Sequence, residues 1–340
     1  MKRNRLTAIV LPILSAFLFL NSASLIAADF GPFDASDLTV KAANRKVESY
    51  RIWPDLAPGE KENRPDGENA QKDPVARIHD VTCPSIMVFR PANGEGSVPA
   101  TDKCMIIFPG GGYSILAYDH EGIRVADFLT SQGITCVVLK YRVPSRHFEG
   151  YQFYTAAFQD GQRTVSFVRA HAKEWGINPE KIGVMGFSAG GNLTMLVATN
   201  GLTRSYAPID EIDQTPCYVN FAAPVYPWRL LKGDYDKNKG NSCMENGQFK
   251  DDIFCDYLAF DAKTPPMCFI HGDADGISAM GSLAVYHKLR TMGISAEVHS
   301  YAKVGHGFGM SPWTNDFGKD PQDKHLGTWI EVVNQWLKKL

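Results

Sequence analysis

The sequence predicts an α/β fold built on a mostly parallel sheet that helices cover on both faces. Two observations carry this prediction. Short, continuously apolar runs alternate with helical segments over most of the chain, a pattern typical of strands that are buried on both faces and joined by crossover helices. One of these runs ends at a serine flanked by glycines, and a helical segment follows that serine directly.

Seven runs have the length and apolar composition of buried strands. The strands are expected at residues 86–89, 104–108, 134–139, 181–185, 218–223, 267–270 and 296–301. Five further segments have apolar residues at helical spacing, and glycine closes the first of them. The helices are expected at residues 120–131, 155–174, 191–198, 279–291 and 325–339.

Residues 1–28 have the features of a secretory signal peptide. Three of the first five residues are basic, residues 6–20 are mostly apolar, and small residues follow. We expect cleavage after Ala27 or Ala28, and therefore a secreted or periplasmic protein with no stable membrane insertion once the signal is removed. A retained membrane anchor is the alternative, but the apolar stretch is short and Pro12 interrupts it.

The remainder, roughly 310 residues, is long enough for one large domain with a substantial core. Residues 29–75 are polar and rich in proline, and we expect them to lie on the surface. Residues 76–340 form the predicted α/β domain. Within it, residues 225–262 are too long for an ordinary connection. They are a candidate lid or substrate-facing insertion, or else an ordered surface excursion.

The net charge and the cysteines limit the classes of partner and of cysteine chemistry to be expected. The net charge is −2, and the basic residues form no stripe, which argues against a nucleic-acid or membrane-surface partner. Of the seven cysteines, three lie in strand-like runs and are expected to be small buried residues. A Cys243–Cys255 bridge is conceivable in an exported protein, and the odd number leaves at least one thiol free.

The serine between glycines is Ser188, in Gly186-Phe187-Ser188-Ala189-Gly190. A serine on a sharp turn from strand to helix presents its hydroxyl to substrate, and the flanking glycines permit the tight backbone. Because a serine hydroxyl is a weak nucleophile at neutral pH, it needs a base, which in turn needs an orienting acid.

Both groups are available at the ends of later strands. His306, between two glycines after the 296–301 strand, is the expected base; His271 and His299 are its rivals. Asp275, after the 267–270 strand, is the expected acid. Asp273 is the alternative acid, although a loop aspartate more often caps backbone amides.

Acyl transfer also needs N–H donors for the oxyanion that develops in the transition state. The backbone N–H of Ala189 is one candidate, and Gly111 or Gly112, after the 104–108 strand, supplies the other. The glycines are not followed by the Lys-Ser/Thr pair of a phosphate-binding loop. No zinc motif such as His-Glu-x-x-His occurs, so neither a metal nor a cofactor is expected.

Taken together, these motifs resemble those of α/β-hydrolase-fold serine esterases, in particular the secreted acetyl-xylan-esterase-like carbohydrate esterases. The resemblance covers about residues 50–340 and is carried by residues 53–59, 109–113, 120–122, 139–142, 160–164, 186–191 and 305–309. It implies cleavage of short-chain, above all acetyl, esters on plant polysaccharides or oligosaccharides through an acyl-enzyme. Pro109 departs from the histidine that hormone-sensitive-lipase-like relatives carry before the glycines.

Two other functions fit the same fold: a prolyl-oligopeptidase-like serine peptidase and a catalytically inactive binding protein. The short N-terminal region argues against the first, and the complete set of Ser188, Asp275 and His306 against the second.

Several further residues have two possible roles. Four aromatic residues either line a sugar-binding face or pack in the interior: Tyr113, Tyr226, Trp228 and Trp313. Asp160 and Arg163 are expected to form a structural pair. Glu121 is expected to act at a helix start, with a substrate contact as the second possibility.

Overall fold

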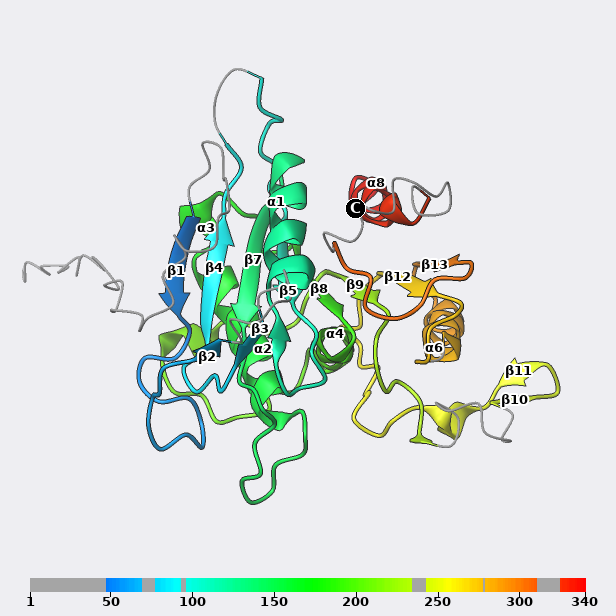
Figure 1. Ribbon diagram of the computed structural model, residues 1–340, viewed down its shortest axis with the longest axis horizontal. Coiled ribbons are helices and arrows are strands. Elements are labelled where there is room, and N and C mark those ends of the chain that lie inside the picture. Colours follow the sequence, from blue (N-terminus) through cyan, green and yellow to red (C-terminus); the bar gives the residue numbers. More distant parts are fainter. Residues whose placement is uncertain (1–46, 69–76, 93–95, 234–242, 278, 311–324) are drawn as a thin grey trace, which may run out of the picture.

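The computed structural model describes residues 47–68, 77–92, 96–233, 243–277, 279–310 and 325–340 (Figure 1). The predicted signal peptide at residues 1–28 lies outside the described residues, as do residues 29–46 and 69–75 of the N-terminal segment and Trp313. The described part of that segment does not lie on the surface as expected, because its first strand joins the central sheet and Ile52 and Trp53 are buried. None of the helices in the described ranges is long and apolar enough to span a membrane.

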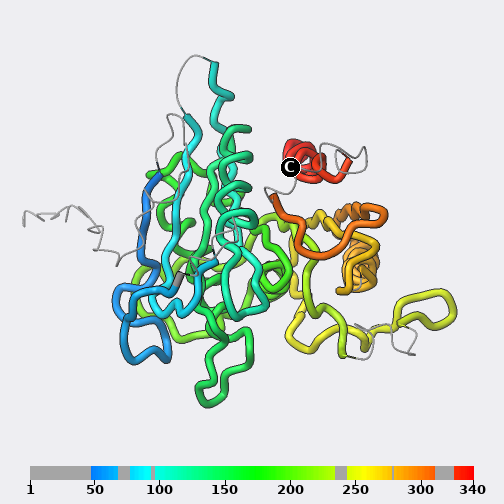
Figure 2. The backbone as a smooth tube through the Cα atoms, in the orientation of Figure 1, coloured from blue at the N-terminus to red at the C-terminus, as the bar shows by residue number. Residues whose placement is uncertain are grey.

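Eight strands form the central sheet, in the order β1-β4-β7-β5-β8-β9-β12-β13. The β1/β4 and β4/β7 pairs are antiparallel, whereas every later neighbour is parallel. The strands are β1 (Val47–Arg51), β4 (Ser85–Phe89), β5 (Cys104–Phe108), β7 (Thr135–Lys140), β8 (Ile182–Phe187), β9 (Phe221–Val225), β12 (Met267–Gly272) and β13 (Ala296–Tyr301). Figure 2 shows the chain passing from blue strands at one edge to orange segments at the other.

The fold prediction of a mostly parallel sheet is confirmed, with two differences. The strand expected at 218–223 begins later, as β9, and β1 was not predicted. All five residues of β1 are only half-buried because it is an edge strand, so its sequence has no continuous apolar run. The core lies in the middle of the sheet, where Ile106 pairs with Val137 on one side and Val184 on the other.

Helices cover both faces of the sheet. The helix α2 packs against α4, while α8 lies beside the end of α1, where Asn334 Nδ2 donates to Gln132 Oε1 at 3.2 Å. The α-helices are α1 (Arg124–Ser131), α2 (Thr155–Ala170), α3 (Ala172–Trp175), α4 (Ala189–Thr199), α6 (Met280–Thr291) and α8 (Trp329–Leu337). A π-helical turn, η1 (Asp119–Ile123), leads into α1, and 3₁₀ turns occur at η2 (Glu211–Gln214) and η3 (Asp251–Ile253).

Two smaller sheets accompany the central one. One consists of β2 (Gly67–Glu68), β3 (Arg77–His79) and β6 (Leu116–Ala117). The other is a hairpin of β10 (Met244–Glu245) and β11 (Gln248–Phe249), within region 225–262. That region has its own small apolar cluster, which includes Ala284 of α6 and therefore anchors the described part of the region on this helix.

The Cys243–Cys255 bridge considered from the sequence is absent, because all seven cysteines are free thiols. Cys243 is buried in the small apolar cluster with Leu231 and Ile253. The thiol of Cys255 instead donates to the carbonyl of Leu231 at 3.2 Å.

The predicted Asp160–Arg163 pair is also wrong. Although three residues apart on α2, the two side chains meet partners from different parts of the chain. Asp160 accepts from the guanidinium Nε of Arg142 at 3.0 Å, and Arg163 pairs with Asp210 at 2.6 Å and with Asp213 at 2.9 Å. Both side chains are fully buried, so each needs a satisfied partner, and the nearest ones are not on the helix.

Candidate active site

Ser188 lies on the turn between β8 and α4, with φ +54° and ψ −113°. The turn is so tight that a side chain fits at neither flanking glycine. A Cβ at Gly186 would lie 2.2 Å from the carbonyl oxygen of Gly190, and one at Gly190 would lie 2.0 Å from that of Phe108. This close approach is the physical reason for the glycines on both sides of the serine.

The backbone of Ser188 is fixed at both of its polar groups. Its N–H donates to the carbonyl of Val225 at 3.1 Å, at the end of β9. Its carbonyl accepts from the N–H of Asn192 at 2.9 Å and from that of Trp228 at 3.0 Å. The serine is therefore held by the neighbouring strand and by the first turn of its own helix.

The structure brings Ser188, His306 and Asp275 into contact in series. His306 Nε2 lies 2.8 Å from Ser188 Oγ, and His306 Nδ1 lies 2.7 Å from Asp275 Oδ2. Both distances are within hydrogen-bond range. A proton on Nδ1, donated to the carboxylate, leaves Nε2 free to accept the proton of the serine hydroxyl.

The Asp275 side chain is fully buried and has several donors around it. Its Oδ1 accepts from the N–H of Ile277 at 2.7 Å, and its Oδ2 also lies 3.5 Å from His271 Nε2. Burial by itself raises the pKa of this carboxyl, but the hydrogen bonds from His271, His306 and the Ile277 N–H outweigh it and lower the pKa to about 2. Asp275 therefore carries a negative charge at neutral pH, as an acid that orients a histidine must.

The three alternatives from the sequence, one acid and two histidines, have other roles. Asp273 is exposed, and its Oδ1 accepts from the N–H of Lys303 at the end of β13, so it caps a backbone amide. His299 lies on β13 and contacts Glu297 at 3.2 Å. His271 is buried; its Nδ1 lies 3.1 Å from Ser282 Oγ, so it supports Asp275 and does not reach Ser188 through this network.

The glycine loop after β5 lies directly against the serine. A Cβ at Gly110 would be 3.1 Å from Ser188 Cβ. Gly111 and Gly112 have φ values of +132° and +63°, which L-residues rarely adopt. Among the described residues, the N–H groups of Gly111, Gly112 and Ala189 meet no acceptor. These three amides remain available to a ligand near the serine.

The sequence did not reveal a buried network that joins the glycine loop to the histidine loop. Glu121, on the π-helical turn η1, accepts from the N–H of Gly110 at 2.8 Å and from the hydroxyl of Tyr226 at 2.8 Å. Tyr226 Oη in turn accepts from the N–H of Gly309 at 2.9 Å. The Tyr226 ring packs edge-on against His306, with 4.9 Å between ring centroids.

Burial raises the pKa of the Glu121 carboxyl, since its two hydrogen bonds offset only part of the desolvation. The only sequence signal for this role is the position of an acid shortly after the strand and its glycine loop. Helix-start chemistry, which we expected of Glu121, is not what this side chain does, because both carboxylate oxygens accept from groups outside its helix.

The BD-FAE family model matches residues 87–289, more than half of the chain, from within β4 to within α6. The chain belongs to the BD-FAE family. This match and the eight-stranded sheet confirm the α/β-hydrolase esterase resemblance seen in the motifs.

Relatives of this BD-FAE protein include an acetylxylan esterase of Xylanibacter ruminicola, 29% identical over 73% of this chain and 48% of the relative. A probable carboxylic ester hydrolase of Mycobacterium tuberculosis, LipM, is 27% identical over 37% of this chain and 28% of its own length. The chain thus spans about half the length, or less, of the curated relatives it matches.

Solved structures share the fold. An acetyl ester-xyloside bifunctional hydrolase from Caldicellulosiruptor lactoaceticus is 25% identical, with a TM-score of 0.57 over 86% of this chain and 96% of the other. A thermophilic esterase from Thermogutta terrifontis, 21% identical, has a TM-score of 0.55 over 83% of this chain and 96% of its own. Both support the α/β-hydrolase fold of the BD-FAE protein.

Of the four aromatic residues with two possible roles, two pack in the interior. Tyr113 and Tyr226 are buried, and the Tyr113 hydroxyl donates to Asn192 Oδ1 at 2.8 Å. Their hydroxyls find partners inside the protein, so the rings belong to the packing around the serine. Trp228 is half-buried, and its ring packs against those of Tyr113 and Phe153.

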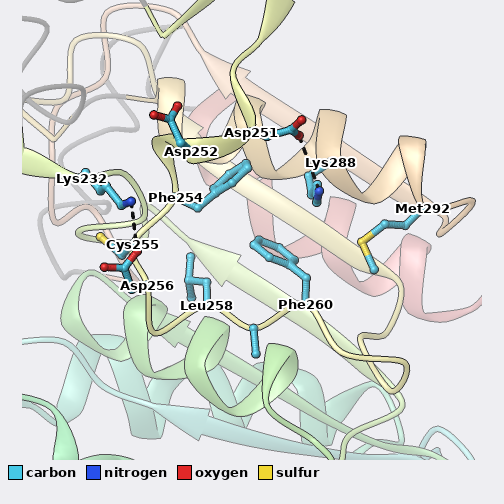
Figure 3. Close-up of a pocket in the computed structure, with 11 residues that line it drawn as sticks. Lys232, Asp251, Asp252, Phe254, Cys255, Asp256, Leu258, Phe260, Lys288 and Met292 are labelled. Carbon is cyan, nitrogen blue, oxygen red and sulfur yellow. Dashed lines mark ion pairs between the residues drawn. The ribbon is translucent and has the colours of Figure 1, made fainter.

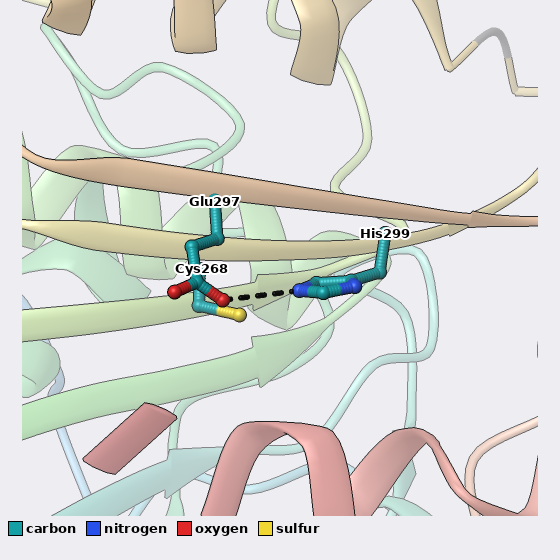
Figure 4. A group of neighbouring side chains, drawn as sticks. All are labelled: Cys268, Glu297 and His299. Atoms are coloured by element: carbon teal, nitrogen blue, oxygen red, sulfur yellow. Dashed lines mark hydrogen bonds and ion pairs between the residues drawn. The ribbon is translucent and has the colours of Figure 1, made fainter. Parts of the chain in front are cut away.

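A group of metal-ligand types lies on β12 and β13, namely Cys268, Glu297 and His299 (Figure 4). Their ligand atoms are within 4.8 Å of one another. Glu297, however, already accepts from His299 at 3.2 Å and from Lys339 at 3.0 Å. Burial raises the pKa of the Cys268 thiol to about 12, so the thiol stays protonated at neutral pH. The cluster is accounted for as an ion-pair network.

Region 225–262 contributes to an open pocket of about 520 Å³ (Figure 3). Phe254, Leu258 and Phe260 form its apolar part. Two ion pairs lie at its rim, Lys232 with Asp256 at 3.0 Å and Lys288 with Asp251 at 3.8 Å. None of Ser188, His306 and Asp275 lines this pocket.

Proposed function

We propose that this protein is a carboxylic ester hydrolase that removes short-chain, above all acetyl, groups from plant polysaccharides or oligosaccharides. The observation that carries the proposal is the contact series from Ser188 through His306 to Asp275, next to three unpaired backbone amides. The names of two similar proteins, an acetylxylan esterase and an acetyl ester-xyloside hydrolase, support the acetyl group and the sugar.

In the first half of the proposed reaction, His306 Nε2 accepts the proton of the Ser188 hydroxyl as Oγ attacks the ester carbonyl carbon. The resulting oxyanion accepts hydrogen bonds from the N–H groups of Ala189, Gly111 and Gly112. The bond to the alcohol then breaks, and His306 returns its proton to the leaving oxygen. Asp275 holds the imidazole and stabilises its positive charge throughout this step.

In the second half, a water molecule takes the place of the alcohol. His306 accepts a proton from the water as its oxygen attacks the acyl carbon, and the same amides hold the oxyanion. The bond to Ser188 Oγ breaks, the serine regains its proton from His306, and the carboxylic acid leaves. The basic and apolar features of residues 1–28 support export as the route to an extracellular polysaccharide.

The test is acetate release from acetylated xylan, pectin, mannan and simple acetyl esters, measured for the wild type and for Ser188→Ala. A matched control is Ser131→Ala at the end of α1, whose hydroxyl makes only local contacts: it donates to the Phe128 carbonyl at 2.6 Å and accepts from Gln132 Nε2 at 3.2 Å. We expect release by the wild type and the control and none by Ser188→Ala. Equal release by all three proteins would refute the assigned nucleophile.

Labelling by a fluorophosphonate probe separates an esterase from an inactive binding protein on the same fold. The wild type and Ser131→Ala should label, and Ser188→Ala should not. Cleavage of a proline-linked chromogenic amide, without cleavage of any acetyl ester, would instead favour a peptidase.

A further inference from the structure

The residue that follows Trp228, Arg229, is held next to the serine in an unusual backbone conformation. Trp228 donates its N–H to the Ser188 carbonyl, so Arg229 is one residue from a direct contact with the nucleophile's backbone. Its φ is +50°, in a region that non-glycine residues rarely adopt because it is strained. Such conformations persist only where the surroundings fix them.

Two side chains fix this conformation. The Arg229 carbonyl accepts from Asn192 Nδ2 at 3.2 Å and from the hydroxyl of Tyr257. Asn192 is fully buried on α4, one turn after the serine, and also accepts from Tyr113. The position of Arg229 is therefore coupled to the same helix turn that holds the serine and to the residue that follows the glycine loop.

The guanidinium of Arg229 lies over aromatic rings at this edge of the site. Its central carbon is 4.9 Å from the centroid of the Trp228 ring and 5.2 Å from that of Phe153. The Phe153 ring is in turn 5.6 Å from the ring of Tyr113, next to Gly112. The rings thus place a cation between the end of β9 and the glycine loop, the two segments that flank the serine.

This cation has no counter-charge. Arg229 is exposed, and among the described residues no carboxylate lies within ion-pair distance of it and no acceptor receives its N–H groups. Other arginines of the domain are paired with carboxylates, as Arg142, Arg146, Arg163 and Arg204 show. A rigidly placed guanidinium with all of its donors unused is suited to bind a planar anion, above all a carboxylate.

We propose that Arg229 is a substrate-binding residue that recognises a carboxylate on the carbohydrate, such as a uronic acid close to the acetylated sugar. Trp228, which is half-buried beside this guanidinium, places an aromatic residue next to that carboxylate, where it can contact a sugar. This inference rests on the proposed ester hydrolysis at Ser188 and adds a substrate class to it: acidic rather than neutral acetylated oligosaccharides.

The test compares acetylated xylo-oligosaccharides with and without a glucuronic acid branch, together with 4-nitrophenyl acetate. The wild type should have the lower KM for the acidic oligosaccharide. Arg229→Gln should raise that KM about tenfold, the size expected of one charge-assisted pair that stays in contact with water. Its kcat/KM for the neutral oligosaccharide and for 4-nitrophenyl acetate should stay within about twofold of the wild type.

Two further variants show whether charge or bidentate geometry matters. Arg229→Lys should restore part of the affinity for the acidic oligosaccharide, since it keeps the charge and loses the planar fork. Arg290→Gln is the matched control. Arg290 is an exposed arginine near the end of α6, which leads into the start of β13. Ser188, by contrast, follows the carboxyl end of β8, so the two residues lie at opposite ends of the parallel strands. It should change none of the constants.

An equal loss on all three substrates in Arg229→Gln would overturn the proposal, since it would show that Arg229 only supports the local structure. Equal KM values of the wild type for the acidic and neutral oligosaccharides would overturn it as well.

Binding measured by calorimetry on Ser188→Ala separates this inference from the proposed function. Preferential binding of a deacetylated, glucuronate-bearing oligosaccharide, lost in the Ser188→Ala/Arg229→Gln double variant, supports the carboxylate site even if no ester is cleaved. Equal binding by both variants overturns the carboxylate site even if acetyl esters are cleaved.

Discussion

Two buried carboxyl groups flank the candidate site, and their surroundings move their pKa values in opposite directions. Asp275 follows β12, and Glu121 follows β5 and its glycine loop. Their side chains are 0% and 5% exposed. The pKa of Asp275 is lowered to about 2, whereas that of Glu121 is raised. Burial alone therefore does not decide the charge of an acid at this site.

The difference lies in the donors. Burial raises the pKa of both groups, but Asp275 receives hydrogen bonds from two histidines and a backbone N–H, and His306 also becomes positively charged during the proposed reaction. Glu121 receives one phenolic hydroxyl and one backbone N–H, both neutral. The two acids therefore differ in role. The charged Asp275 carboxylate orients His306 and stabilises its positive charge, and the hydrogen bonds of Glu121 hold the glycine loop and the histidine loop in place.

The largest expected effect is the loss of kcat when the charge of Asp275 is removed. Asp275→Asn keeps the volume but removes the charge and can stabilise the wrong tautomer of His306, so kcat should fall about 10⁴-fold. The measurement is kcat for 4-nitrophenyl acetate, with circular dichroism to show that the fold is retained. A loss of less than tenfold would mean that another group orients the histidine.

A smaller effect, on stability, is expected when the hydrogen bonds of Tyr226 between Glu121 and the histidine loop are removed. Tyr226→Phe leaves the buried N–H of Gly309 and one oxygen of Glu121 without a partner, so the free energy of unfolding should fall by about 2 kcal/mol. Urea denaturation measures it. Phe308→Leu, which changes a ring packed on Tyr226 without touching these hydrogen bonds, is the comparison variant. Unchanged stability of Tyr226→Phe would show that water replaces the lost hydroxyl.

The raised pKa of Glu121 can be tested through the pH dependence of the unfolding free energy of Glu121→Gln. In Glu121→Gln, the amide can still accept from Gly110 and donate to Tyr226 Oη, but the Tyr226 proton loses its acceptor, so about 1 kcal/mol of stability should be lost near pH 4. Because the pKa of Glu121 is raised in the folded state, the wild type loses stability as pH rises above about 4.5, the ordinary value, and the amide variant does not. The difference between the two should therefore shrink as pH rises.

Asp275 should show the opposite slope. Its pKa is lowered in the folded state from 3.8 to about 2, so the stability it contributes is present above about pH 4 and is lost as pH falls towards 2. The unfolding free energies of the wild type and Asp275→Asn should converge over that interval. If the unfolding free energies of the wild type and Asp275→Asn changed in parallel with pH, the lowered pKa assigned to Asp275 would be contradicted.

The smallest expected effect concerns the other aspartate of the same loop. Asp273→Asn keeps an oxygen that can accept from the Lys303 N–H, and the side chain is exposed. Both kcat and stability should stay close to wild type, within about twofold and about 0.5 kcal/mol. A loss comparable with that of Asp275→Asn would reverse the assignment of the acid.

The sequence predicts those parts of the fold and of the site that depend on short stretches of neighbouring residues. A strand, a serine between glycines and a helix dictate one turn geometry, and polar residues at the ends of parallel strands meet at one edge of the sheet. For that reason Ser188, Asp275 and His306 could be predicted from the sequence alone, and the three side chains lie in contact in the structure.

Contacts between distant segments could not be predicted in this way. Asp160 and Arg163 looked like partners because they are neighbours on a helix, yet each is satisfied by a side chain from elsewhere. Glu121 and Tyr226 are 105 residues apart, and no periodicity links them. The burial of Tyr113 and the free thiol of Cys255 likewise depend on which side chains the completed fold brings near.

The positive φ of Ser188 has a consequence for the energy of the turn. A serine there carries of order 1 kcal/mol of backbone strain, which arises from its Cβ and which a glycine would relieve. Alanine keeps the Cβ and therefore keeps the strain, so Ser188→Ala removes the hydroxyl without relaxing the backbone that presents it.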